Sequence, residues 1–289
     1  VNVSEDQQRY ILTANSLDIP GVIPGISGTL LELNANVTEA AQFGDDGSNR
    51  FFLRIAFSVI DGTAALATLE EKLSAMKAHF DIDWAVHDAA ERPRIMLAVS
   101  KQGHCLNDLL YRWETGALSA DVVAVVSNHD DMRRKTESFG VPYYHLPVTS
   151  DTKPAQEQQI LHLMSEHAVD LLVLARYMQI LSGDLCHALA GRAINIHHSF
   201  LPSFKGAKPY HQAFDRGVKI IGATAHYVTS DLDEGPIIEQ DVQRVEHFHR
   251  AEELVRRGTD VECQVLARAV NWHCEHRVLL NEHKTIVFK

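Results

Sequence analysis

The sequence has few cysteines and no long apolar run. Its four cysteines show no Cys-x-x-Cys spacing, which argues against a disulfide framework; they are Cys105, Cys186, Cys263 and Cys274. No stretch approaches the roughly 20 apolar residues of a membrane-spanning helix, and no signal peptide precedes the first strand-like segment. We therefore expect free thiols, a cytoplasmic location and no membrane partner.

Basic residues are in the minority. The 27 Lys and Arg residues are outnumbered by 38 Asp and Glu residues, which gives a formal net charge of −11. Because phosphate binding requires clustered Lys and Arg, we expect no nucleic-acid partner. A small anionic ligand needs only a local basic pocket, so the net charge leaves that class open.

The length and composition are those of a globular protein with two domains. The 289 residues exceed one typical domain, and 45% hydrophobic with 22% charged residues suffice for a full core. The polar segment "DAAERP", residues 88–93, ends in proline and is typical of a linker. We therefore predict one domain over residues 1–87 and a second over residues 94–289.

The first domain shows a ferredoxin-like pattern. Strand patterns cover residues 9–18, 37–43, 50–59 and 81–87, and helical patterns cover residues 19–36 and 63–80. The order βαββαβ defines the ferredoxin-like fold. The stretch "SLDIPGVIPGISGTLLELNANV" resembles an ACT domain, a small regulatory module, which implies an amino-acid effector and a homo-oligomer. The alternative is a ferredoxin-like fold that serves oligomerisation alone.

The second domain is predicted to be a Rossmann-like α/β fold. Near-continuous apolar strands such as "RIMLAVS" and "DLLVLA" alternate with helical segments, which indicates a mostly parallel sheet buried on both faces. Ligands of such sheets bind at the carboxyl ends of the strands. The strand "RAINIHH" places Asn195 and His197 at such an end. Residues two apart on a strand face the same side, so both can reach one pocket.

Asn195, His197 and Asp233 are the candidate catalytic residues. Acyl transfer from an amide needs a donor for the oxyanion, a group that moves protons, and a partner that orients it. An Asn amide, a His imidazole and an Asp carboxylate supply these in that order, and no Ser, Cys or Lys is indicated as a nucleophile. The alternative for each is structural: His197 and His198 as hydrogen-bonded core histidines, and Asp233 as a turn residue before Gly235.

Two segments resemble the folate-dependent formyltransferase family. They are "NIHHSFLPSFKGA", from Asn195, and "GATAHYVTSDLDEGPIIEQ", from Gly222. The resemblance implies the same catalytic trio, and it implies that "RYMQILS", residues 176–182, is the folate loop. The implied substrate-binding residues are Met178, Gln179, Ile180, Leu181, Gly206, Lys208, His226, Tyr227, Val228 and Thr229. For Lys205 and Lys208, attraction of a glutamate tail and a plain solvated lysine both remain open.

Within that family the chain resembles the formyltetrahydrofolate deformylases. The helix-like pattern that runs to Leu279 leaves no room for the C-terminal barrel of methionyl-tRNA formyltransferases. The segment "VSKQGHCLNDLL", with Lys101 and one glycine, Gly103, lacks the Gly- and Asn-rich phosphate loop of glycinamide ribonucleotide formyltransferases. An ACT domain joined to a formyltransferase-like domain is the deformylase arrangement.

The resemblance implies a linear-amide hydrolase that uses water as acceptor. Its substrate would be 10-formyltetrahydrofolate and its products formate and tetrahydrofolate, which would balance the one-carbon folate pool and supply formate for purine synthesis. No cofactor and no metal are expected, and the histidines of "HCEH" and "EHFHR" are interpreted as structural or solvated. Two alternatives remain: a formyltransferase with a small amine acceptor, such as a glycinamide ribonucleotide, and a folate-binding regulator without turnover.

Overall fold

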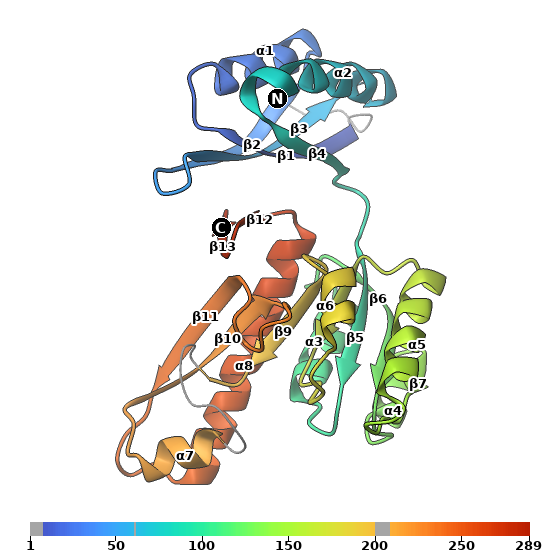
Figure 1. Cartoon of the computed structure of the whole chain (residues 1–289), viewed down its shortest axis with the longest axis vertical. Coiled ribbons are helices and arrows are strands. Elements are labelled where there is room, and N and C mark those ends of the chain that lie inside the picture. The colour runs from blue at the N-terminus through green and yellow to red at the C-terminus, as the bar shows by residue number, and fades with distance from the viewer. Residues whose placement is uncertain (1–7, 61, 200–208) are drawn as a thin grey trace. The chain divides into compact units, whose positions relative to one another are not determined.

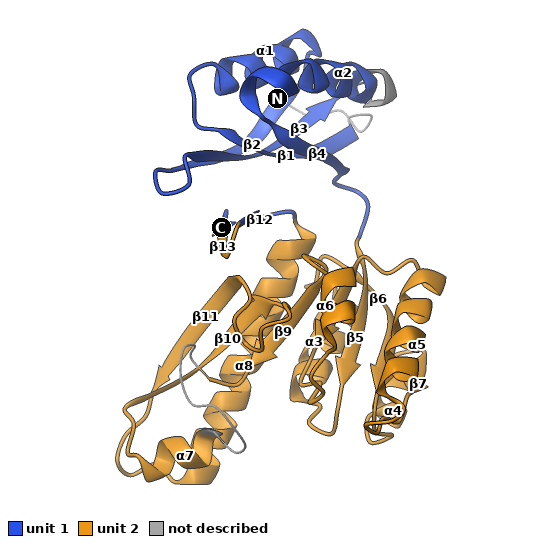
Figure 2. Cartoon of the chain, in the orientation of Figure 1, with its two compact units in different colours: residues 1–92, 276–281, 286–289 blue, residues 93–275, 282–285 orange. Residues whose placement is uncertain are grey.

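The computed structural model describes residues 8–60, 62–199 and 209–289 (Figure 1). The chain forms two compact units (Figure 2): unit 1 contains residues 1–92, 276–281 and 286–289, and unit 2 contains residues 93–275 and 282–285. No helix in the described part of the chain has both the length and the apolar character needed to cross a membrane.

Unit 1 is an antiparallel sheet with helices on one face (Figure 1). Its elements are β1 (Gln8–Leu17), α1 (Val22–Glu32), β2 (Asn36–Asp45), β3 (Arg50–Val59), α2 (Gly62–Phe80) and β4 (Asp83–Asp88). The strand order is β2-β3-β1-β4 and every pairing is antiparallel. The predicted ferredoxin-like βαββαβ order is confirmed.

The core of unit 1 lies between its sheet and its two helices. Leu12 and Phe57 from the strands and Ile26, Leu30 and Leu69 from the helices are buried in one apolar cluster. Such burial stabilises each large side chain by about 1.5–3 kcal/mol relative to exposure, and so fixes the helices on this face.

Unit 2 contains a seven-stranded, mostly parallel sheet. Its elements are β5 (Arg94–Val99), α3 (His104–Glu114), β6 (Asp121–Ser127), α4 (Arg133–Glu137), β7 (Tyr143–His145), α5 (Lys153–Glu166), β8 (Leu171–Leu174), α6 (Gly183–Ala188), β9 (Ala193–His197), α7 (Pro209–Asp215), β10 (Ile220–Tyr227), β11 (Ile237–Arg244) and α8 (Ala251–Cys274). The strand order is β11-β10-β9-β8-β5-β6-β7. The five strands from β9 to β7 are parallel, whereas β10 runs antiparallel to both of its neighbours, β9 and β11.

Helices cover both faces of the sheet in unit 2, as its apolar strands predict. Ile160 of α5 and Leu185 of α6 pack on one face, against Met96 and Leu172. The long helix α8 packs on the opposite side, where it contacts β9, β10, β11 and α3. Because β5, β8 and β9 are parallel, their carboxyl ends lie at one edge, and the loops that leave this edge are free to form a site.

The C-terminal segment differs from the helix predicted through Leu279. Helix α8 ends at Cys274, and His276 adopts a left-handed backbone with φ of 53°, which ends the helical hydrogen bonding. A two-stranded sheet of β12 (Val278–Asn281) and β13 (Lys284–Val287) follows. Within unit 1, Arg277 donates to Glu39 at 2.8 Å and Asn281 donates to Asp45 at 2.8 Å.

Candidate active site

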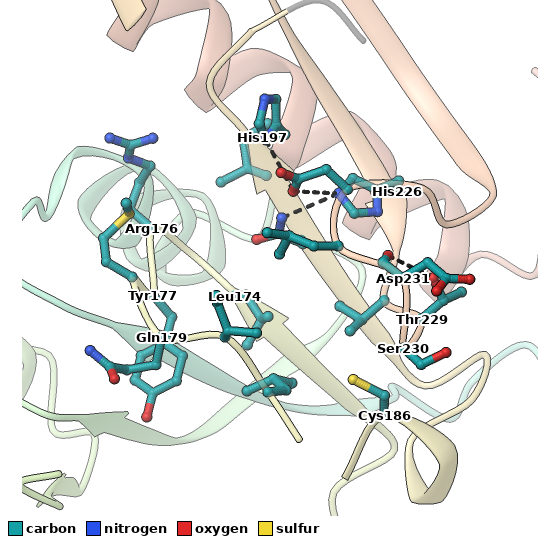
Figure 3. Close-up of a pocket in the computed structure, with 18 of the residues that line it drawn as sticks. Leu174, Arg176, Tyr177, Gln179, Cys186, His197, His226, Thr229, Ser230 and Asp231 are labelled. Atoms are coloured by element: carbon teal, nitrogen blue, oxygen red, sulfur yellow. Dashed lines mark hydrogen bonds and ion pairs between the residues drawn. The ribbon is translucent and has the colours of Figure 1, made fainter. Parts of the chain in front are cut away.

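A cavity of about 300 Å³ lies in unit 2, at the carboxyl ends of β8 and β9 (Figure 3). The end of β8 with its following loop, α6, the end of β9, and the loop between β10 and β11 supply its walls. The described lining residues are Leu174, Arg176, Tyr177, Met178, Gln179, Ile180, Leu181, Cys186, Asn195, Ile196, His197, His198, His226, Val228, Thr229, Ser230, Asp231, Leu232 and Asp233.

Strand pairing brings Asn195, His197 and His226 together. Asn195 and His197 share one face of β9, and β10 runs antiparallel beside it with His226 directly opposite Asn195. Nε2 of His226 lies 3.2 Å from Nδ2 of Asn195, and Nδ1 of the same ring lies 2.9 Å from the Tyr227 carbonyl oxygen. The amide and the imidazole are therefore held as a pair.

The loop between β10 and β11 carries Asp233 to His197. Asp233 has a left-handed backbone with φ of 60°. Two residues later, a Cβ on Gly235 would lie 1.7 Å from the Tyr227 carbonyl oxygen, so only glycine fits there. This tight return places Oδ1 of Asp233 3.1 Å from Nδ1 of His197 and 3.8 Å from Nε2 of His226. Dashed lines mark contacts of both histidines in Figure 3.

The site holds a carboxylate beside neutral imidazole. The hydrogen bond from His197 lowers the pKa of Asp233 below its ordinary value of 3.8, although burial opposes this shift. Burial lowers the pKa of His226, so that ring is neutral near pH 7. Asp233 is thus ionised and is placed to accept from Nδ1 of His197, so Nε2 is the ring nitrogen left for a second partner.

Ser199 is a partner of His197 that the sequence did not indicate. Its hydroxyl lies 3.0 Å from Nε2 of His197, and both side chains are buried. Ser199 is not among the residues that line the cavity. A serine two residues after a histidine carries no sequence signal of such a contact, because the contact depends on the bend of the chain at the end of β9.

The predicted folate loop follows β8 and is held by Ser100. The backbone amide of Met178 donates to the Ser100 hydroxyl at 2.9 Å, and the Ser100 amide donates to the Arg176 carbonyl at 3.1 Å. Met178 and Ile180 are 57% and 62% exposed, which is unusual for large apolar side chains. The loop therefore presents apolar surface to any flat ring in the cavity.

Most of the predicted binding residues line this cavity. Met178, Gln179, Ile180, Leu181, His226, Val228 and Thr229 do so together with the catalytic candidates Asn195, His197 and Asp233. Their roles stay predictions. Gly206 and Lys208 lie outside the described residues, as do Pro202 and Lys205 of the same segment.

Tyr227, although predicted as a binding residue, is not among the described lining residues. It is 4% exposed, and its hydroxyl hydrogen-bonds to Nδ1 of His273 at 2.6 Å. Neighbouring residues of a strand point to opposite faces, so His226 faces the cavity while Tyr227 faces α8. Its amide and carbonyl are engaged as well, with Pro236 and His226.

One cluster in the described part of the chain has metal-ligating side chains. The ligand atoms of His104, Cys105 and Glu262 lie within 4.8 Å of one another. The Glu262 carboxylate already accepts from His104 at 2.7 Å and from Tyr210 at 2.6 Å, and the Arg176 guanidinium lies 3.4 Å away. Burial raises the pKa of the Cys105 thiol well above its usual range. The Arg176 cation already compensates the Glu262 carboxylate, and a protonated thiol is a poor metal ligand. We therefore interpret the cluster as a hydrogen-bond network and assign no metal to it.

Comparison with known proteins gives consistent matches. Residues 93–270 match the formyl transferase family. A formyltetrahydrofolate deformylase from Corynebacterium sp. (strain P-1) is 45% identical over 284 residues, which cover 98% of this chain and 99% of the relative. The crystal structure of a formyltetrahydrofolate deformylase from Burkholderia mallei matches with a TM-score of 0.92 and 48% identity, over 98% of this chain and 100% of that one.

A more distant structure matches part of the chain. Glycinamide ribonucleotide transformylase 1 from Symbiobacterium toebii matches with a TM-score of 0.65 and 28% identity, over 70% of this chain and 97% of its own. The transformylase therefore matches only part of this chain, although nearly its whole length is aligned. The two deformylases match almost the whole of this chain.

Proposed function

The chain belongs to the formyltetrahydrofolate deformylase family, and we propose that it hydrolyses 10-formyltetrahydrofolate to formate and tetrahydrofolate with Asn195, His197 and Asp233. The observation that carries this proposal is the convergence of three groups in one cavity. The imidazole of His197 lies 3.1 Å from the Asp233 carboxylate, and Asn195 lies on the same face of β9. An amide donor, a proton acceptor and a carboxylate are the groups that water-dependent amide cleavage needs.

In the proposed reaction, water attacks the formyl carbon. The new carbon–oxygen bond forms while Nε2 of His197 takes a proton from the water, for which this nitrogen gives up its hydrogen bond with the Ser199 hydroxyl. Asp233 stabilises the imidazolium that results. The Nδ2–H group of Asn195 donates to the tetrahedral oxyanion. His197 then returns the proton to N10 of the folate as the carbon–nitrogen bond breaks, which leaves tetrahydrofolate and formic acid, and the acid loses its proton to the solvent as formate.

The decisive experiment is incubation of the purified protein with 10-formyltetrahydrofolate and no amine. We expect equal amounts of formate and tetrahydrofolate. Asn195→Ala should lower kcat by about 10²–10³, the usual effect of removing one oxyanion donor, and Asp233→Ala should also lower kcat strongly. Release of no formate, or near-native turnover by both variants, would overturn the proposal. Formation of a formylated product only after an amine is added would assign a formyltransferase instead.

Three finer properties are part of the same proposal. The released formate serves purine synthesis, the ACT-like unit 1 binds an amino-acid effector, and the protein is a cytoplasmic homo-oligomer. The ferredoxin-like order of unit 1 supports the effector and the oligomer, and the four free cysteines support the cytoplasmic location. Light scattering measures the oligomer, and turnover with and without glycine or methionine tests the effector. A monomer, or a rate unchanged by every amino acid, would contradict the corresponding part.

A further inference from the structure

Unit 2 contains a second cavity, of about 650 Å³, beside the first. Arg176, Met178, Gln179 and His198 line both cavities. The other described residues of the second cavity come from the ends of β5 and β6 and from α7 and α8: Ser100, Lys101, Gln102, Asn128, His129, Tyr210, His211, Val255, Thr259 and Glu262. The two cavities therefore share a wall, and His198 is part of it.

The described lining of the second cavity carries one more cation than carboxylate. Lys101 and Arg176 bring positive charge to it, and Glu262 is the sole carboxylate among its described lining residues. Glu262 is fully buried, and its charge is countered by Arg176 at 3.4 Å. In a chain with a formal net charge of −11, this local excess of cations favours a small anion.

Arg176 retains hydrogen-bonding capacity. It is 8% exposed, and two of its nitrogens donate to Gln102, one of them at 3.1 Å. Its Nη1 atom is buried and, in the described part of the chain, has no hydrogen-bond partner. A buried guanidinium nitrogen without an acceptor is uncommon and is the kind of donor that a carboxylate satisfies.

His198 faces both cavities as a neutral ring. It stacks on His197 with ring centroids 5.0 Å apart and planes 17° apart. Burial, together with the charge of Arg176, lowers the pKa of His198 to about 4, so the ring is uncharged near pH 7. Within the described ranges its ring makes no hydrogen bond.

We propose that the second cavity admits the hydrolytic water and releases formate, with His198 binding that water against the formyl carbon. The inference rests on the proposed hydrolase function and adds a route to it. The folate substrate fills the first cavity during turnover, so water and formate need another path, and the adjoining second cavity can provide one. His198 accepts a hydrogen bond from the water without taking its proton, because His197 is the proton acceptor. Arg176 and Lys101 attract the formate monoanion as it leaves.

The first test compares His198→Phe with His198→Gln. Phenylalanine keeps a flat ring against His197 but removes both nitrogens, whereas glutamine restores a hydrogen-bonding group. We expect His198→Phe to lower kcat by about 10², the scale of a misplaced reactant, with tetrahydrofolate affinity unchanged in a fluorescence titration. His198→Gln should regain part of that loss. Near-native kcat in His198→Phe, with formate still released by the wild type, would overturn this inference and leave the hydrolase assignment intact.

The second test blocks the cavity from α8 and does not depend on His198. Thr259→Trp would fill the second cavity, and Asp260→Trp places the same side chain at the neighbouring exposed position as a control. We expect Thr259→Trp to lower kcat at least about tenfold and to weaken product inhibition by formate, since a bulky group excludes both small molecules. Asp260→Trp should match the wild type. Unchanged turnover in Thr259→Trp, or formylation of added glycinamide ribonucleotide by the wild type, would overturn the inference.

Discussion

The His226 ring determines how the Asn195 amide is turned. Nδ1 of His226 lies 2.9 Å from the Tyr227 carbonyl oxygen, which can only accept, so Nδ1 carries the proton. Nε2 of the same ring therefore has the lone pair and accepts from Nδ2 of Asn195 at 3.2 Å. One N–H of the amide is fixed in this bond, and the other is left for the oxyanion of the proposed reaction.

His226 should therefore act as a positioning residue. His226→Leu leaves Nδ2 of Asn195 without its acceptor, and we expect kcat to fall by about 10² with little change in folate affinity. His226→Gln, whose side-chain carbonyl can accept in place of Nε2, should recover part of the rate. Steady-state kinetics with a tetrahydrofolate titration separates the two effects. If both variants lose the same rate, or if the loss is entirely in KM, the orienting role is contradicted.

The hydrogen bond between Asp233 and His197 predicts an acid-dependent stability. The pKa of Asp233 is lowered by the hydrogen bond from His197, so the unfolded chain binds this proton more readily. The stabilisation is therefore present above about pH 3.8 and is lost as the pH falls through the lowered native value. Asp233→Asn should be less stable than the wild type at pH 7, and the gap should close in acid. Urea unfolding over a pH series measures it, and a gap that is constant with pH would exclude this linkage.

The fold could be predicted because its signals are local. Each strand and helix of unit 1 has its own hydrophobic periodicity. In unit 2, each apolar strand is a continuous hydrophobic run, which by itself predicts that the strand is buried. The β12–β13 pair was missed because its short strands follow directly on the long amphipathic helix α8. The left-handed residue that separates them, His276, has no such signal, since the left-handed backbone usually calls for glycine or asparagine.

The site was only partly predictable because its contacts are non-local. Asn195 and His197 are two apart on one strand, but the Asn195–His226 pair needs the antiparallel register of β10 beside β9. The buried position of Glu262, in contrast, could have been predicted from the sequence. It continues the spacing of four that joins Leu254, Gly258 and Leu266 on the buried side of α8, where a carboxylate must find partners.

His273 predicts a loss of stability at mildly acidic pH. Burial lowers the pKa of His273 from 6.5 to about 4, and its Nδ1 lies 2.6 Å from the Tyr227 hydroxyl. Between pH 6.5 and about pH 4 the imidazole is protonated in the unfolded chain but not in the native protein. The free energy of unfolding therefore decreases by about 1 kcal/mol for each unit by which the pH is lowered. His273→Gln should lose less stability between pH 7 and pH 5 than the wild type. Urea unfolding at both pH values measures this. If the wild type and His273→Gln lose the same free energy of unfolding between pH 7 and pH 5, His273 is not involved.

Gly258 and Tyr210 give a prediction opposite to helix propensity. Alanine normally stabilises a helix interior by about 1 kcal/mol relative to glycine. A Cβ on Gly258, however, would lie 2.1 Å from Cζ of Tyr210, whose hydroxyl donates to the buried Glu262 carboxylate at 2.6 Å. Gly258→Ala should displace Tyr210, so that the Glu262 carboxylate loses the hydrogen bond from the tyrosine hydroxyl. We expect the free energy of unfolding to fall by about 1–3 kcal/mol.

The matched control for that substitution is Gly183→Ala, at the start of α6 in the same unit. A Cβ on Gly183 meets no atom within 4 Å, so this variant should unfold at the wild-type urea concentration or slightly above it. A lower midpoint for Gly258→Ala alone would tie the loss to Tyr210, because both substitutions add the same methyl group. If Gly258→Ala instead matched the control, Tyr210 would have room to move while keeping its bond, and the Glu262 network would tolerate change on the α8 side.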